Sequence, residues 1–151
     1  MDQNHSRARI SVNQVAPEAY KAVLGLEQYV RGHVDATLLH LIKLRASMVN
    51  GCSYCVDMHS TEALKDGIDG RKLFALAAWR EGPFFDARER AALALTDDVT
   101  HLGRDGVPDA VWDEAVAQFG EEGTGNILVA IATINVWNRI AITTRSQPPG
   151  V

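Results

Sequence analysis

Hydrophobic residues recur every three or four positions along most of the chain, whereas alternating runs of Val, Ile, Thr and aromatic residues are scarce. The first pattern is typical of amphipathic helices, and the second would indicate strands. Proline, glycine and capping residues divide the pattern into about seven segments. We expect helices near residues 17–30, 36–50, 52–66, 71–80, 87–100, 108–120 and 124–143. The sequence therefore predicts an all-α fold.

The last of these segments carries apolar residues around its whole circumference, among them Ile127, Ile134 and Trp137. A helix with one solvated face does not need so many apolar positions. We expect this helix to lie at the centre of the core or in a contact between subunits. Its apolar run at 127–134 is much shorter than the roughly 20 residues of a membrane-spanning helix, so we expect no membrane segment.

Length and composition agree with one folded unit. The chain has 151 residues, of which 46% are hydrophobic and 23% are charged, and this is ordinary for a globular domain. We expect a single domain over residues 1–151, with a core at about 17–143 and flexible ends. The formal charge of −4 does not favour nucleic acid as a partner. No apolar run that could form a signal-peptide core occurs near Met1, so we expect a cytoplasmic protein.

Candidate chemistry is concentrated at the only two cysteines, Cys52 and Cys55, which His59 follows four positions later. On a helix, this spacing places the three side chains along one stripe, with Cys52 at the N-terminal end. The helix N-terminus and the imidazole can each raise the thiolate fraction of a cysteine. A second thiol can then condense with the oxidised first one. The spacing predicts a thiol redox site.

Other interpretations of these residues stay open. The cysteines can be small core residues beside an inert histidine. Cys52, Cys55 and His59 can also join His40 as two-Cys, two-His ligands of zinc, although His40 precedes Cys52 by twelve residues and the other three lie along one helix. A thioredoxin-type site shares the Cys-x-x-Cys spacing, but it requires a β–α–β setting that this helical pattern lacks.

Several segments around the cysteine pair resemble the carboxymuconolactone decarboxylase superfamily, and more narrowly its alkylhydroperoxidase D-like (AhpD-like) branch. They are Leu-Arg-Ala-Ser at 44–47, Asn-Gly-Cys-Ser-Tyr-Cys-Val-Asp-Met-His at 50–59, Glu-Ala at 62–63, and further segments at 74–80, 89–93 and 130–139. The resemblance thus covers about residues 17–140. It implies an all-helical protein that forms trimers or hexamers, uses no organic cofactor and acts in antioxidant defence as a thiol-dependent peroxidase or disulfide reductase.

The resemblance also implies roles for individual residues. Cys55 would react with a small hydroperoxide, Cys52 would resolve the oxidised thiol, and His59 would belong to a proton relay. An external dithiol or protein reductant would reopen the disulfide, since the chain has no flavin or nicotinamide fingerprint. The lactone-decarboxylating members lack the cysteine pair, which favours the redox branch. A decarboxylase-type acid/base enzyme that uses His59 and His40, or a non-catalytic oligomeric module, remains as an alternative.

One position departs from the pattern of the redox branch. That branch has a glutamate twelve residues before the first cysteine, where this chain has His40. A histidine can pass protons, but it can be cationic where a glutamate is anionic. We predict that His40 serves the relay, so that its replacement by alanine would lower peroxide turnover by about tenfold or more.

Overall fold

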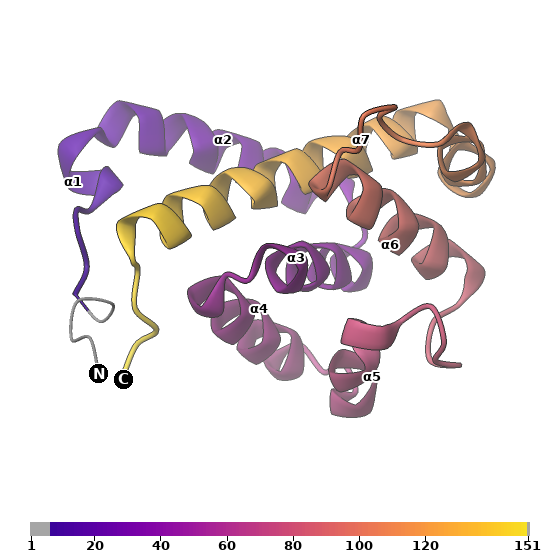
Figure 1. Ribbon diagram of the computed structural model, residues 1–151, viewed down its shortest axis with the longest axis horizontal. Helices are drawn as coiled ribbons and strands as arrows, with labels where there is room; N and C mark the ends of the chain where they lie inside the picture. Colours follow the sequence, from indigo (N-terminus) through magenta and orange to yellow (C-terminus); the bar gives the residue numbers. More distant parts are fainter. Residues whose placement is uncertain (1–6, 151) are drawn as a thin grey trace.

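The computed structural model describes residues 7–150, which form seven α-helices and one 3₁₀ turn (Figure 1). The elements are α1 (Val12–Val15), α2 (Pro17–His33), α3 (Ala36–Asn50), α4 (Ser53–Lys65), α5 (Gly70–Ala75), η2 (Leu76–Ala78), α6 (Ala87–Thr100) and α7 (Asp109–Thr144). No strand occurs between residues 7 and 150, and the only pairing of that type is an isolated bridge between Gly103 and Gly106. The predicted all-α fold of about seven helices is confirmed.

The helix boundaries differ from the predicted ones in three places. The short helix α1 was not expected, because four residues are too few to show a helical period. The segment expected as one helix at 71–80 is divided into α5 and the 3₁₀ turn η2. The segments expected at 108–120 and 124–143 run on as α7, with non-helical φ/ψ of 71° and 173° at Gly120. Glycine adopts positive φ without a steric penalty, and here it allows a kink in place of a break.

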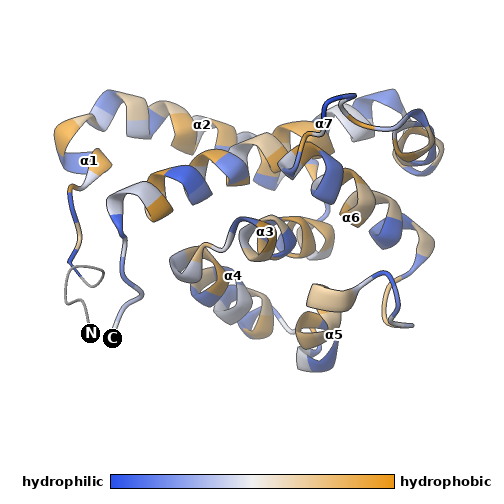
Figure 2. Cartoon of the chain, in the orientation of Figure 1, coloured by the Kyte–Doolittle hydropathy of each residue, from blue (hydrophilic) through white to orange (hydrophobic). Residues whose placement is uncertain are grey.

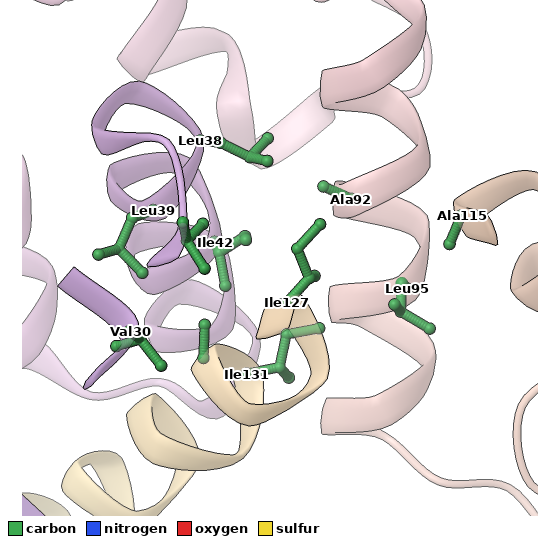
Figure 3. Packing of buried hydrophobic residues seen from close by; sticks show 11 residues of the cluster. Val30, Leu38, Leu39, Ile42, Ala92, Leu95, Ala115, Ile127 and Ile131 are labelled. Atoms are coloured by element: carbon green, nitrogen blue, oxygen red, sulfur yellow. The ribbon is translucent and has the colours of Figure 1, made fainter. Parts of the chain in front are cut away.

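Helix α3 lies in the middle of the molecule, between α2 and α7 on one side and α4 and α5 on the other (Figure 1). It is apolar around most of its circumference and therefore contributes to two core clusters. The first joins α3 to α2, α6 and α7 (Figure 3), and its buried members are Val30, Val34, Leu38, Leu39, Ile42, Ala92, Leu95, Ala115, Ile127, Ala130 and Ile131. The second joins α3 to α4, α5, η2 and α6, with Leu41, Leu44, Ala63, Leu73, Leu76, Trp79, Phe85 and Leu93.

The helices around α3 mix hydrophobic and hydrophilic residues along their length, as amphipathic helices do (Figure 2). Helix α7 differs from them, because by length and composition alone it could cross a membrane, with a mean hydropathy of 1.4 over its most apolar window. In this structure α7 packs against α2, α3, α4 and α6, and its buried residues include Ile127, Ile131 and Ile134. Helix α7 therefore contributes to the core around α3, while Leu128 and Ile142 of the same helix are exposed. The absence of a membrane segment stays a prediction.

A tight turn between α3 and α4 positions the cysteine motif. Gly51 ends α3 in the left-handed conformation, with φ of 68°, which glycine adopts without a steric penalty. The backbone N–H of Cys52 then donates to the carbonyl of Ser47 at 3.0 Å. This turn makes Cys52 the N-cap residue of α4. The two cysteines consequently lie at the helix N-terminus that the sequence predicts.

Candidate active site

The sulfur atoms of Cys52 and Cys55 are joined in a disulfide within the first turn of α4. The Sγ of Cys52 also accepts the backbone N–H of Cys55 at 3.3 Å, so a sulfur fills the role of the capping side chain. Each cysteine is 1% exposed. The expected proximity of the two sulfurs is confirmed, and it places redox-capable sulfur at the positive end of a helix dipole.

A cavity of about 550 Å³ lies beside the disulfide, between α2, α4, α7 and the segment before α1. Cys55 contributes to its wall and Cys52 does not. Most of the lining is apolar or aromatic, including Tyr20, Leu24, Tyr54, Met58, Trp137 and Ile140. The rings of Tyr20 and Trp137 meet edge to face, with centroids 5.1 Å apart. The cavity therefore combines an apolar body with one reactive sulfur.

His59 is the imidazole of this site, one helical turn after Cys55 and in the wall of the same cavity. It is only 4% exposed, and its Nδ1 lies 3.3 Å from Oε2 of Glu62. Its Nε2 is buried and has no hydrogen-bond partner in the described part of the chain. Burial, followed by the positive charge of Lys43, lowers the pKa of His59 to about 4, against the opposing effect of Glu62. His59 is therefore neutral at pH 7 and can accept a proton.

Half-buried Glu27, which lines the cavity, forms an ion pair with buried Lys43. Glu27 of α2 accepts hydrogen bonds from Lys43 of α3, from Nε of Arg31 at 3.1 Å and from the indole N–H of Trp137 at 3.3 Å. Lys43 is 3% exposed, and burial lowers its pKa although Glu27 acts in the opposite direction. Burial raises the pKa of Glu27, but Lys43 and Arg31 outweigh that effect and lower it overall.

Sequence reasoning missed Glu27 and Lys43. The available signal was a lysine in a helical stretch, 38–44, that is apolar apart from Lys43 and His40, and a charge there must be paired if it is buried. Glu27, its partner, lies sixteen residues earlier on another helix. No local spacing connects the two.

His40 is the predicted site residue that the structure places elsewhere. Its Nε2 lies 2.7 Å from Oδ2 of Asp66, at the end of α4 that is remote from the cysteines. His40 is not among the residues that line the cavity. Its hydrogen-bonding partner is thus Asp66 and not His59. The relay role of His40 stays a prediction, and this position does not support it.

The zinc interpretation also gains no support. Within residues 7–150, no three side chains of His, Cys, Asp or Glu lie close enough together to hold a metal ion. The two sulfurs are bonded to each other, whereas zinc binds cysteine as a thiolate. His40, the fourth ligand of that interpretation, is paired with Asp66.

Comparison with known proteins assigns the family. The model of the carboxymuconolactone decarboxylase family matches residues 17–98, more than half of the chain. The chain belongs to this family. It is also 36% identical over 135 residues to the uncharacterized protein YdfG of Bacillus subtilis, covering 89% of this chain and 92% of that protein. YnjA of Escherichia coli, also uncharacterized, is 26% identical over 106 residues, which are 70% of this chain and 58% of that protein.

Solved structures place the chain in the AhpD-like part of the superfamily. A protein of unknown function from Agrobacterium tumefaciens, described as a candidate antioxidant defence protein AhpD, is 43% identical, with a TM-score of 0.92 and coverage of 96% of this chain and 100% of that one. The debrominase Bmp8 is 26% identical, with a TM-score of 0.77 and coverage of 89% of this chain and 73% of that one. The family thus includes enzymes, and the fold of this chain is the AhpD-like fold.

Proposed function

We propose that this protein is a thiol-dependent peroxidase that cycles through the Cys52–Cys55 disulfide and is recharged by an external dithiol. The observation that carries the proposal is the disulfide at the wall of an apolar cavity, one helical turn from a neutral, buried imidazole. The similarity to the Agrobacterium protein described as AhpD supports an antioxidant role. Residues 7–150 contain no cysteine besides Cys52 and Cys55.

The proposed cycle begins with the reduced pair. His59 takes the thiol proton of Cys55, and the thiolate attacks the terminal oxygen of a hydroperoxide. The O–O bond breaks, the sulfur becomes a sulfenic acid, and the alkoxide leaves as an alcohol with the proton from His59. Cys52 then attacks the oxidised sulfur as a thiolate, and its proton joins the departing hydroxide, so that the disulfide forms and one water departs. A dithiol finally returns two electrons and two protons by exchange.

Cys55 takes the attacking role in this proposal because it lines the cavity and Cys52 does not. The capping position of Cys52 suits the resolving role, since the N–H of Cys55 at 3.3 Å and the helix dipole both favour its thiolate form. The apolar lining indicates an organic hydroperoxide with a hydrophobic body in preference to hydrogen peroxide.

The wider setting is also a proposal. We expect a homo-oligomer, a trimer or hexamer as the family resemblance implies, and the exposed apolar side chains Phe74 (77%) and Leu64 (47%) are consistent with a subunit contact. The recharging partner would be a small dithiol or a protein that carries one. A cytoplasmic location and the lack of a nucleic-acid partner remain predictions from the sequence.

Trapping of the sulfenic acid tests the order of the two cysteines. Reduced Cys52→Ser protein should react with cumene hydroperoxide and then take up a sulfenic-acid label at Cys55, whereas reduced Cys55→Ser protein should take up little label. Mass spectrometry of the labelled peptides gives the answer. Label confined to Cys52 would reverse the assignment. Turnover of a lactone by a variant that lacks both thiols would instead favour the acid/base alternative.

A second candidate is reductive dehalogenation of a small aromatic compound. It is favoured by the Tyr20–Trp137 wall of the cavity and by the similarity to debrominase Bmp8. The balance would be that two thiols become a disulfide, the carbon–bromine bond breaks, and the carbon takes one proton while bromide and the other proton leave. Bromide release from a brominated pyrrole by the reduced protein, with no reaction toward cumene hydroperoxide, would put this candidate first.

A further inference from the structure

The Lys43–Glu27 ion pair has no part in the proposed cycle, although its carboxylate belongs to the wall of the cavity. Glu27 lines the cavity together with Cys55 and His59. Its carboxylate is held by Lys43, by Arg31 at 3.1 Å and by the indole of Trp137 at 3.3 Å. These donors come from α3, α2 and α7. The position of the carboxylate is therefore fixed by three helices.

Stability alone gives little reason for this pair. Removing two charges from water costs several kcal/mol per ion, and apolar residues of similar size are often as stable or more stable at such positions. The neighbours of Lys43 along its helix, Leu41, Ile42 and Leu44, are fully buried and apolar. A methionine would fit that pattern. A lysine at this point of the helix requires a different explanation.

The charged groups that influence the pKa of His59 come from three helices. They are Glu62 on α4, Lys43 on α3 and Glu27 on α2, and Arg31 joins the set through its ion pair with Glu27. The α7 side contributes the uncharged indole of Trp137. Among these groups Lys43 is the one cation that acts on the imidazole directly, and it is buried together with the imidazole.

We propose that Lys43 and Glu27 form a positioning pair for the thiol chemistry: the ammonium of Lys43, together with burial, disfavours protonation of His59 before the reaction, and the carboxylate of Glu27, together with that of Glu62, stabilises the imidazolium that transfer of the Cys55 proton creates. Both residues act through His59. The inference rests on the proposed function for its chemical meaning. It also supplies, from α2 and α3, the relay groups that the position of His40 beside Asp66 does not supply.

The test is an NMR titration of the His59 ring in the reduced protein, followed by its ring C–H signals. Lys43→Met should raise the His59 pKa by about one unit or more, because a nearby cation is lost while the carboxylates remain. Glu27→Gln should lower it, because a nearby anion is lost. The control Asp97→Asn removes a comparable half-buried carboxylate elsewhere and should leave the titration unchanged. Shifts in opposite directions distinguish charge placement from a general loss of structure, which would move both variants the same way.

Two further variants protect the result against a folding defect. Lys43→Arg keeps the charge and should restore a low His59 pKa. The double variant Lys43→Met/Glu27→Gln removes both charges, and its His59 pKa should lie between those of the single variants. An unchanged titration in Lys43→Met, or a shift in the same direction in both single variants, would overturn the inference.

The rate of peroxide oxidation separates this inference from the proposed function. If the inference is correct, the acidic limb of the rate against pH moves upward in Lys43→Met by the same interval as the NMR titration. If the NMR shifts occur but the wild-type thiols do not react with cumene hydroperoxide, the charge pair stands and the peroxidase function fails. If the thiols react and the titration does not move, only the role of the pair fails.

Discussion

Two half-buried carboxylates, Glu27 of α2 and Asp97 of α6, have almost the same kinds of partners. Each accepts from a basic residue of α3, from a second, exposed arginine and from a tryptophan indole. For Glu27 the partners are Lys43, Arg31 and Trp137, and for Asp97 they are Arg45, Arg80 and Trp79. The two clusters are thus chemically matched, with basic residues two positions apart on one helix.

The surroundings of the two clusters differ. Arg45 donates to both oxygens of Asp97, at 2.6 and 3.1 Å, and also to the carbonyls of Leu76 and Ala77. Its planar fork therefore ties α3 to α6 and to the 3₁₀ turn η2. Lys43 is a point charge that pairs with one carboxylate, and its positive charge also lowers the pKa of His59, after the larger effect of burial. The same kind of ion pair connects helices in one place and faces a reactive histidine in the other.

The largest stability effect should come from the cluster that connects helices. Asp97→Asn leaves Arg45 largely buried without its anion, and breaking such a pair typically costs about 3–5 kcal/mol. Urea unfolding at pH 7 should show this loss. The rate of peroxide oxidation per folded molecule should not change, because Asp97 does not border the cavity. If Asp97→Asn kept its stability but lost much of its rate of peroxide oxidation, the two clusters would not differ in role as described.

A smaller effect should appear in the pH dependence of stability, through His59. Its pKa is about 4 in the folded chain against an ordinary value of 6.5. The unfolded chain therefore binds the proton first, and stability is lost as the pH falls from 6.5 toward 4. From pH 7 to pH 5, this group should account for a loss of roughly 1–2 kcal/mol.

His59→Leu should reduce that pH dependence in the disulfide-bonded protein, as measured by urea unfolding at the two pH values. Glu27 and Asp97 do not complicate the comparison. Their pKa values are lowered from ordinary values of 4.5 and 3.8, by Lys43 and Arg45 respectively against the effect of burial, so their contribution is lost only at lower pH. If the free energy of unfolding fell as steeply with pH in His59→Leu, the effect would belong to other groups.

The smallest effect is expected at His40. Because its ring lies against Asp66 and outside the cavity, His40→Ala should lower the rate of peroxide oxidation by less than about threefold. Asp66→Asn is the matched control, since it removes the partner and keeps the histidine. A tenfold loss in His40→Ala alone would return His40 to the relay, as its sequence position suggests.

Local signals in the sequence predicted most of the fold. Capping residues and glycines predicted the bounds of the helices because each acts within a few residues, as Asp35 and Asp86 do at the starts of α3 and α6 and Gly51 does at the end of α3. For the same reason, the spacing of the cysteines and His59 correctly predicted that they lie along one helix. All three lie on one helix, so that their separation along the chain determines their separation in space.

The missed features depend on contacts between helices that are distant along the chain. Glu27 meets Lys43 and Trp137 only after α2, α3 and α7 have packed together. His40 illustrates the same limit, because its position relative to the cysteines does not reveal that its ring lies against Asp66 at the far end of α4. Spacing along the chain does not show which residue a side chain will contact in the folded protein.

The most direct test of the central claim is the intact mass of the reduced wild-type protein before and after one equivalent of cumene hydroperoxide. We predict a loss of the mass of two hydrogen atoms, the disappearance of both free thiols and full recovery with a dithiol. An unchanged mass with both thiols still free would contradict the peroxidase account and leave the Cys52–Cys55 pair to a different substrate.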